Sequence, residues 1–182
     1  MMRLATLRAM STEATGELTL RPMESQADAD AFRALNEEWI ARWFRFEDKD
    51  RIALSDPHRT FVVPGGQVYV ALRGATVVGT AALIRYPDDV YELSKMAVAP
   101  ATRGQGVGRT LLAYTIEQAR ARGARFVFLG SSTKLTSAVR LYESFGFRHV
   151  PPSDLPELKY DRADVFMKLE LEGAPQRRGA NS

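Results

Sequence analysis

The chain has 182 residues, of which 45% are apolar and 26% are charged, and it contains no cysteine. This length and composition fit one globular domain with short tails and exclude a chain that is mostly disordered. The absence of cysteine excludes disulfides, thiolate nucleophiles, iron–sulfur clusters and zinc fingers. The formal net charge is only +3, so we predict no basic surface for nucleic acid.

Residues 1–16 and 172–182 differ in composition from the rest of the chain. The first segment lacks the apolar stretch of a signal peptide and reads as a flexible leader, and the second reads as a disordered tail. Nowhere does the chain approach the ~18 consecutive apolar residues of a membrane-spanning helix. We therefore expect a cytoplasmic protein with one domain over residues 17–171 and no membrane partner.

The first half of that domain predicts one strand, two helices and then three strands. A short strand over residues 18–21 stops at Pro22, and Ser25 caps a helix whose apolar side chains share one face. Those apolar side chains are Phe32, Leu35, Trp39, Ile40 and Trp43. A shorter helix follows over residues 48–54. The three strands, joined by tight turns, cover residues 67–72, 77–86 and 90–98.

The second half of the domain alternates between helix and strand. The predicted segments are a helix over residues 110–122, a strand over 126–129, a helix over 135–145 and a strand over 164–171. Gly123 and Gly146 end the two helices. A meander followed by a strand–helix–strand unit predicts an α/β fold of the α+β type, in which about four helices flank a mixed, mostly antiparallel sheet.

The segment after the predicted strand 90–98 is rich in glycine and arginine. It reads Arg103, Gly104, Gln105, Gly106, Val107, Gly108, Arg109. The first N–H groups of a helix attract anions, and glycine lets the backbone approach a phosphate, so this segment predicts a phosphate cradle flanked by the two arginines. The P-loop pattern and the G-x-G-x-x-G dinucleotide pattern both fail, because arginine stands at positions 103 and 109.

The pattern that this loop does match is R-x-x-G-x-G, at Arg103, Gly106 and Gly108. With M-A-V-x-P upstream at 96–100 and A-x-x-L-Y-x-x-x-G-F downstream at 138–147, it resembles the acetyl-CoA cradle of the GNAT superfamily of N-acetyltransferases. The resemblance covers residues 17–171, and the predicted order of elements is also that family's order.

The resemblance implies that acetyl-CoA is the co-substrate. We expect no metal, because the two histidines, His58 and His149, lie far apart and no carboxylate pattern indicates a metal site. Its pantetheine would lie between the fourth and fifth strands, against the backbone of Met96, Ala97 and Val98. Its pyrophosphate would rest on the amides of residues 103–109, and the Val98 N–H would hold the developing oxyanion.

Two residues are candidates for acid–base catalysis. Tyr142 matches the family's general acid, which would supply a proton or a hydrogen bond to the departing thiolate. Glu92, six residues before Val98, is the candidate general base, and Ser94 or a water held by a backbone carbonyl is the alternative. Without a catalytic role, Tyr142 would only pack on the core and Glu92 would lie on the surface at a sheet edge. Leu135 departs from the family pattern, because many members have asparagine there.

These residues imply an N-acetyltransferase that passes the acetyl group directly to a primary amine in a ternary complex. The alternative is a non-catalytic module that binds or senses acyl-CoA. The acceptor would be a small-molecule or peptide amine, bound by residues 36–66 and 150–163. The acidic and aromatic residues there would suit a cationic amine. In the alternative interpretation, the acidic residues form a solvated helix face and the tryptophans belong to the core. The resemblance also leaves a homodimer open.

Overall fold

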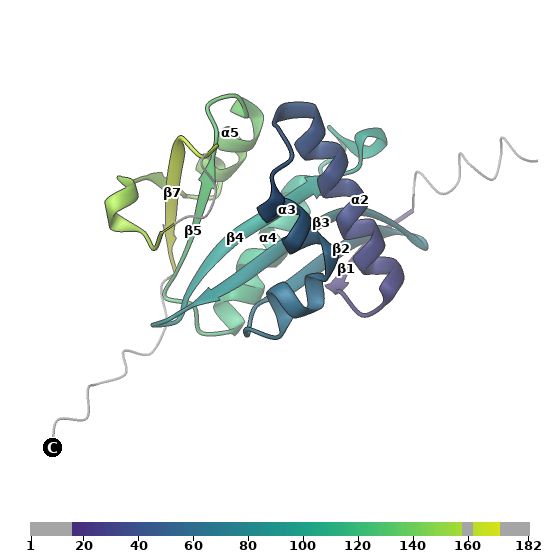
Figure 1. Cartoon of the computed structure of the whole chain (residues 1–182), viewed down its shortest axis with the longest axis horizontal. Helices are drawn as coiled ribbons and strands as arrows, with labels where there is room; N and C mark the ends of the chain where they lie inside the picture. Colours follow the sequence, from purple (N-terminus) through teal and green to yellow (C-terminus); the bar gives the residue numbers. More distant parts are fainter. Residues whose placement is uncertain (1–15, 158–161, 172–182) are drawn as a thin grey trace, which may run out of the picture.

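The computed structural model describes residues 16–157 and 162–171 (Figure 1). The predicted tails therefore lie almost entirely outside the described residues. The strands are β1 (Leu18–Pro22), β2 (Gln67–Arg73), β3 (Thr76–Tyr86), β4 (Val90–Val98), β5 (Phe126–Ser131), β6 (Arg148–His149) and β7 (Val165–Glu170). The helices are α2 (Gln26–Trp43), α3 (Asp48–Ser55), α4 (Val107–Ala121) and α5 (Thr136–Ser144), with short helical turns at His58–Val62, Pro100–Thr102 and Pro152–Asp154.

The strands and helices expected from the sequence are present in the predicted order, with two differences. Helix α4 begins at Val107 rather than at residue 110, and Val107 is buried one turn before Leu111 on the same face. The glycine and arginine between them hid this first turn from the sequence pattern. The two-residue strand β6 and the π-helical turn His58–Val62 were not predicted. Both are too short to produce a periodic pattern.

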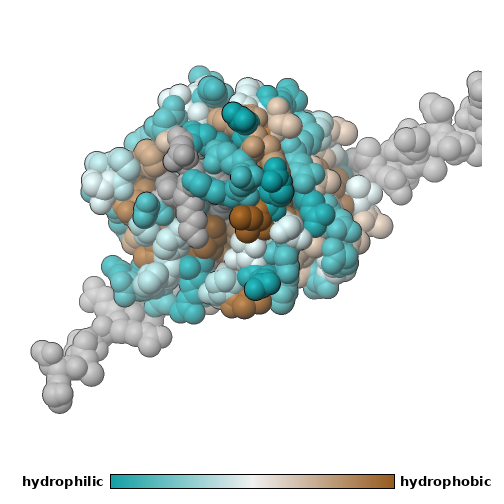
Figure 2. All heavy atoms as spheres, in the orientation of Figure 1, coloured by the Kyte–Doolittle hydropathy of each residue, from teal (hydrophilic) through white to brown (hydrophobic). Residues whose placement is uncertain are grey.

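Seven strands form one sheet in the order β1-β2-β3-β4-β5-β7-β6. Only β4 and β5 pair in parallel, which confirms the prediction of a mixed, mostly antiparallel sheet. Helices α2 and α3 lie on one face of the sheet and α4 on the other (Figure 1). The outward surface over α2 and α3 is mostly hydrophilic, with small apolar patches (Figure 2).

Two apolar clusters hold these layers together. Beneath α4, Leu111 and Leu112 are fully buried against the sheet, and part of α5 packs on the same cluster. Beneath α2 and α3, Phe32 and Leu54 pack against the other face. Helix α2 begins at a capping box, in which Asp28 accepts hydrogen bonds from the backbone at Ser25 and also binds Arg21 on β1. The box anchors the start of α2 on the sheet.

Strands β4 and β5 part halfway along their length. Their parallel pairing ends where Glu92 lies beside Phe128, after which β5 pairs only with β7. Three residues farther along, β4 carries a bulge, because the two residues Lys95 and Met96 oppose the single residue Ala81 of β3. Lys95 has a φ of 50°, in the left-handed region that a lysine seldom adopts. The bulge and the lost pairing leave a wedge between the two strands.

Candidate active site

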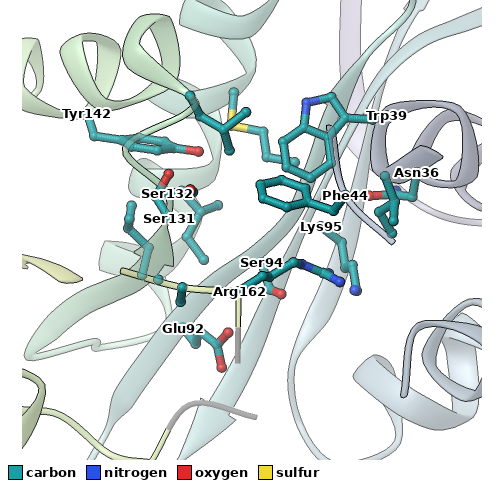
Figure 3. Close-up of a pocket in the computed structure, with 17 residues that line it drawn as sticks. Asn36, Trp39, Phe44, Glu92, Ser94, Lys95, Ser131, Ser132, Tyr142 and Arg162 are labelled. Carbon is teal, nitrogen blue, oxygen red and sulfur yellow. The ribbon is translucent and has the colours of Figure 1, made fainter. Parts of the chain in front are cut away.

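A pocket lies at this wedge, between the C-terminal half of α2 and Tyr142 of α5 (Figure 3). Its lining comes from four separate stretches of chain and from one residue of α5. Those residues are Asn36, Trp39, Ile40 and Phe44; the β4 residues 92–96; residues 129–132 with Leu135; Tyr142; and Arg162 with Ala163. The pocket therefore exists only because β4 and β5 separate and α2 crosses in front of them.

Glu92 lies on the floor of the pocket, on the sheet face that α2 and α3 cover. The register places it opposite Ile84, whose side chain packs on the cluster beneath those helices. Its exposed fraction is only 5%, and its Oε2 accepts a hydrogen bond of 2.9 Å from the hydroxyl of Tyr86. Because β4 is a central strand, the alternative of a surface glutamate at a sheet edge is wrong.

Tyr142 reaches the same pocket from α5. In Figure 3 its hydroxyl points toward the central group of side chains, with Glu92 at the bottom of the view. The ring packs 5.8 Å from that of Phe147, centroid to centroid. Burial raises the pKa of the Tyr142 phenol to about 12, so the phenol keeps its proton at neutral pH. The two residues that sequence reasoning singled out for catalysis therefore line one pocket.

The backbone at the end of β4 faces the wedge. The N–H of Ala99 donates to the carbonyl of Val78 at 2.8 Å, which makes these two residues a hydrogen-bonded pair. Bonded and non-bonded pairs alternate in an antiparallel ladder, so Val98, which lies opposite Gly79, turns its N–H and C=O away from β3. The Val98 carbonyl accepts a hydrogen bond of 3.1 Å from Arg103 Nε. The Val98 N–H is therefore directed toward the space between β4 and β5.

The start of α4 has the geometry expected of an anion cradle. Gly106 is the N-cap, with a φ of 82°, and Gly104 has a φ of 77°. No side chain caps the helix. The first backbone bond within α4 runs from the N–H of Thr110 to the carbonyl of Gly106, so the preceding N–H groups have no partner inside the helix.

The two arginines beside the cradle have partners within the fold. Arg103 forms an ion pair of 2.6 Å with Glu38 on α2 in addition to its bond to Val98. Arg109 donates to the hydroxyl of Ser144 at 3.1 Å and lies over the ring of Phe145. The charge of Arg103 is therefore balanced by Glu38, and this ion pair joins α2 to the segment that follows β4.

One charged cluster beside the pocket was missed by the sequence reading. Asp50 of α3 is fully buried and binds Lys95 at 2.7 Å and Arg162 through two bonds of 2.8 Å. Burial opposes ionisation of Asp50, but the bonds from Arg162 and Lys95 outweigh it and hold its pKa below the usual range. Burial lowers the pKa of Lys95. No sequence signal links these residues, because they belong to three distant segments.

The aromatic residues of the acceptor region divide between the pocket and the surface. Trp39 lines the pocket and its ring lies 5.7 Å from that of Phe44, whereas Trp43 is 40% exposed. Trp39 is partly buried and packs against the cluster beneath α2 and α3, so the core reading fits it in part, whereas Trp43 is not a core residue. Of the acidic residues expected in the loop before β7, Asp161 lies outside the described residues, as does the nearby aromatic Tyr160.

Residues 16–157 and 162–171 contain no group of three or more histidine or acidic side chains placed to hold a metal ion. Among the helices of this described part, none is both long and apolar enough to span a bilayer.

Comparison with known proteins gives matches to the acetyltransferase (GNAT) family and to individual relatives. A model of the acetyltransferase (GNAT) family matches residues 28–147. The uncharacterized N-acetyltransferase YjgM of Escherichia coli is 34% identical over 100 residues, which cover 53% of this chain and 60% of that protein. N-acetylaspartate synthetase of Rattus norvegicus is 37% identical over 92 residues, covering 50% of this chain and 31% of that protein. The chain thus matches less than two thirds of either relative's own length.

A solved structure supports the fold. A putative acetyltransferase from Salmonella typhimurium, solved with its cofactor acetyl-CoA, is 25% identical and superposes with a TM-score of 0.65. The match covers 85% of this chain and 94% of the solved chain. The likeness therefore extends over most of the chain.

Proposed function

The chain belongs to the GNAT family of acetyltransferases, and we propose that it transfers an acetyl group from acetyl-CoA to a primary amine. One observation carries the proposal: β4 and β5 part beside Glu92, and both Glu92 and Tyr142 line the pocket at that place. A carboxylate can take a proton from an amine, and a phenol can stabilise a departing thiolate.

The residues around the wedge suit acetyl-CoA as a substrate. Of the three assigned residues Met96, Ala97 and Val98, Val98 turns its backbone away from β3 and Met96 lies in the bulge, so these two offer hydrogen bonds to the amides of pantetheine. Ala97 is paired with Thr80 of β3 and contributes through its position between them. The uncapped start of α4, with positive φ at Gly104 and Gly106, suits the pyrophosphate. The cradle, as assigned, consists of Arg103, Gly104, Gln105, Gly106, Val107, Gly108 and Arg109. Arg103 stands at the edge of the cradle, because its side chain is bound to Glu38 and its N–H donates to the carbonyl of Pro100.

Glu92 acts as the base in the proposed reaction. An alkyl ammonium with a pKa of about 10 cannot attack a thioester until it loses a proton. The Glu92 carboxylate takes that proton, directly or through a water. The amine nitrogen then forms a bond to the acetyl carbon as the carbon–sulfur bond breaks. The Val98 N–H donates to the carbonyl oxygen on which negative charge develops. Transfer is direct, because the chain has no cysteine to carry the acetyl group.

Tyr142 stabilises the departing sulfur. With a pKa of about 12, its phenol is a much weaker acid than an ordinary thiol, whose pKa is about 8.5. Complete proton transfer from phenol to thiolate is therefore uphill at equilibrium. The role that fits is a hydrogen bond from the phenol to the sulfur as negative charge collects there, and solvent then supplies the final proton.

The test is the release of CoA thiol from acetyl-CoA in the presence of pooled primary amines and short peptides. The wild type is compared with Tyr142→Phe and Glu92→Gln. Release that depends on an amine pool and falls at least tenfold in each variant is the expected result. If Glu92→Gln keeps full activity while Ser94→Ala loses it, the assignment of the base moves to Ser94.

The non-catalytic alternative predicts a different pattern. A module that only binds acyl-CoA would show a higher melting temperature with acetyl-CoA but no thiol release from any pool. Loss of both the thermal shift and the release would contradict the assignment of the cradle itself. The acceptor pools include amino acids because one relative is named N-acetylaspartate synthetase, which describes an acetylated amino acid as the product of that protein.

A further inference from the structure

Asn36, in the C-terminal half of α2, lines the pocket although the residue itself is fully buried. Its Nδ2 donates hydrogen bonds of 2.9 Å to the carbonyl of Phe32 and of 3.3 Å to the hydroxyl of Thr80 on β3. Among the residues that the structure describes, none donates a hydrogen bond to its Oδ1. Folded proteins seldom leave a buried acceptor in this state, because the desolvated oxygen costs free energy.

The donor end of the Asn36 amide fixes where its oxygen points. Exchanging Oδ1 and Nδ2 would set an oxygen against the carbonyl of Phe32, so the observed orientation is the favourable one. The two atoms leave the same carbon in diverging directions, and Oδ1 therefore points away from Phe32 and from Thr80. Figure 3 shows Asn36 at the right of the pocket, with its oxygen directed toward Phe44. The unpartnered oxygen thus faces the pocket.

Asn36 meets the sheet beside the proposed oxyanion site. Thr80, which accepts its hydrogen bond, lies opposite Ala97 in the β3–β4 register, and Ala97 directly precedes Val98. Val98 is the residue whose N–H is proposed to hold the thioester carbonyl. Glu92 lies six residues earlier along β4. In the register of the sheet, Asn36 is therefore closer to the thioester than the proposed base is.

Asn36 approaches this position from the face of the sheet that α2 and α3 cover. Thr80 shares that face with Ala82, which packs in the cluster beneath these helices. Ser94 lies opposite Ala82, so its side chain is on the same face, as is that of Glu92. The pantetheine of the proposed acetyl-CoA complex would instead lie in the plane of the sheet, between β4 and β5. A group that contacts Oδ1 therefore belongs to the molecule on the α2 side, which is the acceptor.

We propose that Asn36 Oδ1 accepts a hydrogen bond from an N–H group of the acceptor amine and so orients the nitrogen toward the thioester. This inference rests on the proposed function and adds a substrate-binding residue to the same site. An amine offers N–H donors and, when protonated, no acceptor, so it matches a lone acceptor oxygen. A hydrogen bond to this oxygen also removes the cost of leaving it buried without a partner.

The hydrogen bond acts at the step in which the new bond forms. The ammonium first gives a proton to Glu92 through a water, which leaves a lone pair and two N–H groups on a primary amine. With one N–H bonded to Asn36 Oδ1, the lone pair faces the acetyl carbon while the Val98 N–H holds the carbonyl oxygen. The nitrogen–carbon bond forms as the carbon–sulfur bond breaks. The nitrogen then gives its second proton to solvent, and the amide product keeps one N–H.

The test compares Asn36→Leu with the wild type on the amine that gives the fastest thiol release in the pooled assay. Leucine has the same branching as asparagine but no polar atoms. We expect kcat/KM for this amine to fall about tenfold or more, while the KM for acetyl-CoA changes less than about twofold. Thr80→Val is the matched control, because it removes one bond to Nδ2 and keeps Oδ1. It is expected to lower kcat/KM less than about threefold.

Thermal unfolding separates substrate binding from support of the fold. The double variant Asn36→Leu with Thr80→Val removes the unpartnered oxygen together with both members of one buried hydrogen bond. Replacing both partners by apolar groups is close to neutral, so we expect its melting temperature to stay within about 3 °C of the wild type while activity falls as in Asn36→Leu. A purely structural role predicts that stability and activity fall together. If the double variant does not fold, Asn36→Ala is measured with the same two readouts.

The remaining outcomes distinguish this inference from the proposed function. A folded Asn36→Leu or Asn36→Ala that keeps full kcat/KM for the amine overturns the inference. A raised KM for acetyl-CoA with unchanged kinetics toward the amine also overturns it, because Oδ1 would then accept from an amide N–H of pantetheine. Both results leave the transferase in place. If the wild type acetylates no amine of any class, the proposed function fails and the inference fails with it.

Discussion

The hydroxyl of Tyr86 on β3 donates a hydrogen bond of 2.9 Å to Glu92 on β4, one strand away. Tyr86 is thus placed to orient the proposed base. Tyr86→Phe removes the hydrogen bond but keeps the ring that packs on Phe128. We expect kcat to fall about tenfold, or about 1.4 kcal/mol, while the KM for acetyl-CoA stays constant.

The double variant distinguishes orientation from general damage. If Tyr86 acts through Glu92, then Tyr86→Phe has little further effect in a Glu92→Gln background. A full tenfold loss in both backgrounds, or a raised KM for acetyl-CoA, would show that Tyr86 supports the pocket in another way.

Asp50 is expected to be the most sensitive charged residue for stability. Asp50→Asn leaves Lys95 and Arg162 buried without the carboxylate that both bind. Breaking a buried ion pair in this way costs about 3 to 5 kcal/mol, so thermal or denaturant unfolding will show a large loss. Asp48→Asn on the same helix is the matched control, because Asp48 is 86% exposed and its single pair with Arg51 contributes about 0.5 kcal/mol or less. A loss of less than about 1 kcal/mol in Asp50→Asn would contradict the role assigned to the cluster.

At low pH, protonation of Asp28 is expected to weaken the contacts that anchor the start of α2 on the sheet. The hydrogen bonds from Arg21 lower the pKa of this carboxyl to about 2. A depressed folded-state pKa means that the stabilisation is complete above the ordinary value near 4 and is lost as the pH falls toward 2. We expect Asp28→Asn to be less stable than the wild type by about 2 kcal/mol at neutral pH, with the difference vanishing near pH 2. Unfolding curves of both proteins between pH 2 and pH 7 measure this difference. A gap that persists at pH 2 would contradict a stabilisation that depends on the ionised carboxylate.

Alanine variants of two glycines distinguish a loss of acetyl-CoA binding at the cradle from the general effect of backbone strain. Gly106 and Gly123 have φ values of 82° and 76°, and an added Cβ would meet nothing within 4 Å at either position. Alanine at either site therefore carries the same strain, about 1 kcal/mol. Only Gly106→Ala changes the start of α4, so we expect acetyl-CoA affinity to fall about tenfold in that variant alone. Calorimetric titration of both variants checks this, and equal affinities would contradict the position of the cradle.

The candidate site was only partly predictable from the sequence. Glu92 and Tyr142 were identified because each lies at a set distance from a local motif, and the structure places both on one pocket. The charged cluster around Asp50 was not identified, because Lys95 and Arg162 are 45 and 112 residues away from Asp50. Charged residues at such separations carry no periodic pattern, so only their spatial arrangement reveals the ion pairs.

By itself the amino-acid sequence determined the longer helices and strands and their order, because side-chain periodicity, caps and turn residues act over a few residues. It also located the glycine-rich start of α4. The tertiary structure alone decided where β4 and β5 part, that Glu92 is buried beside Tyr86, and which charges border the pocket. These features depend on strand register and on the packing of α2 and α3 across the sheet. Such contacts join segments that are distant in the chain, and no local pattern encodes them.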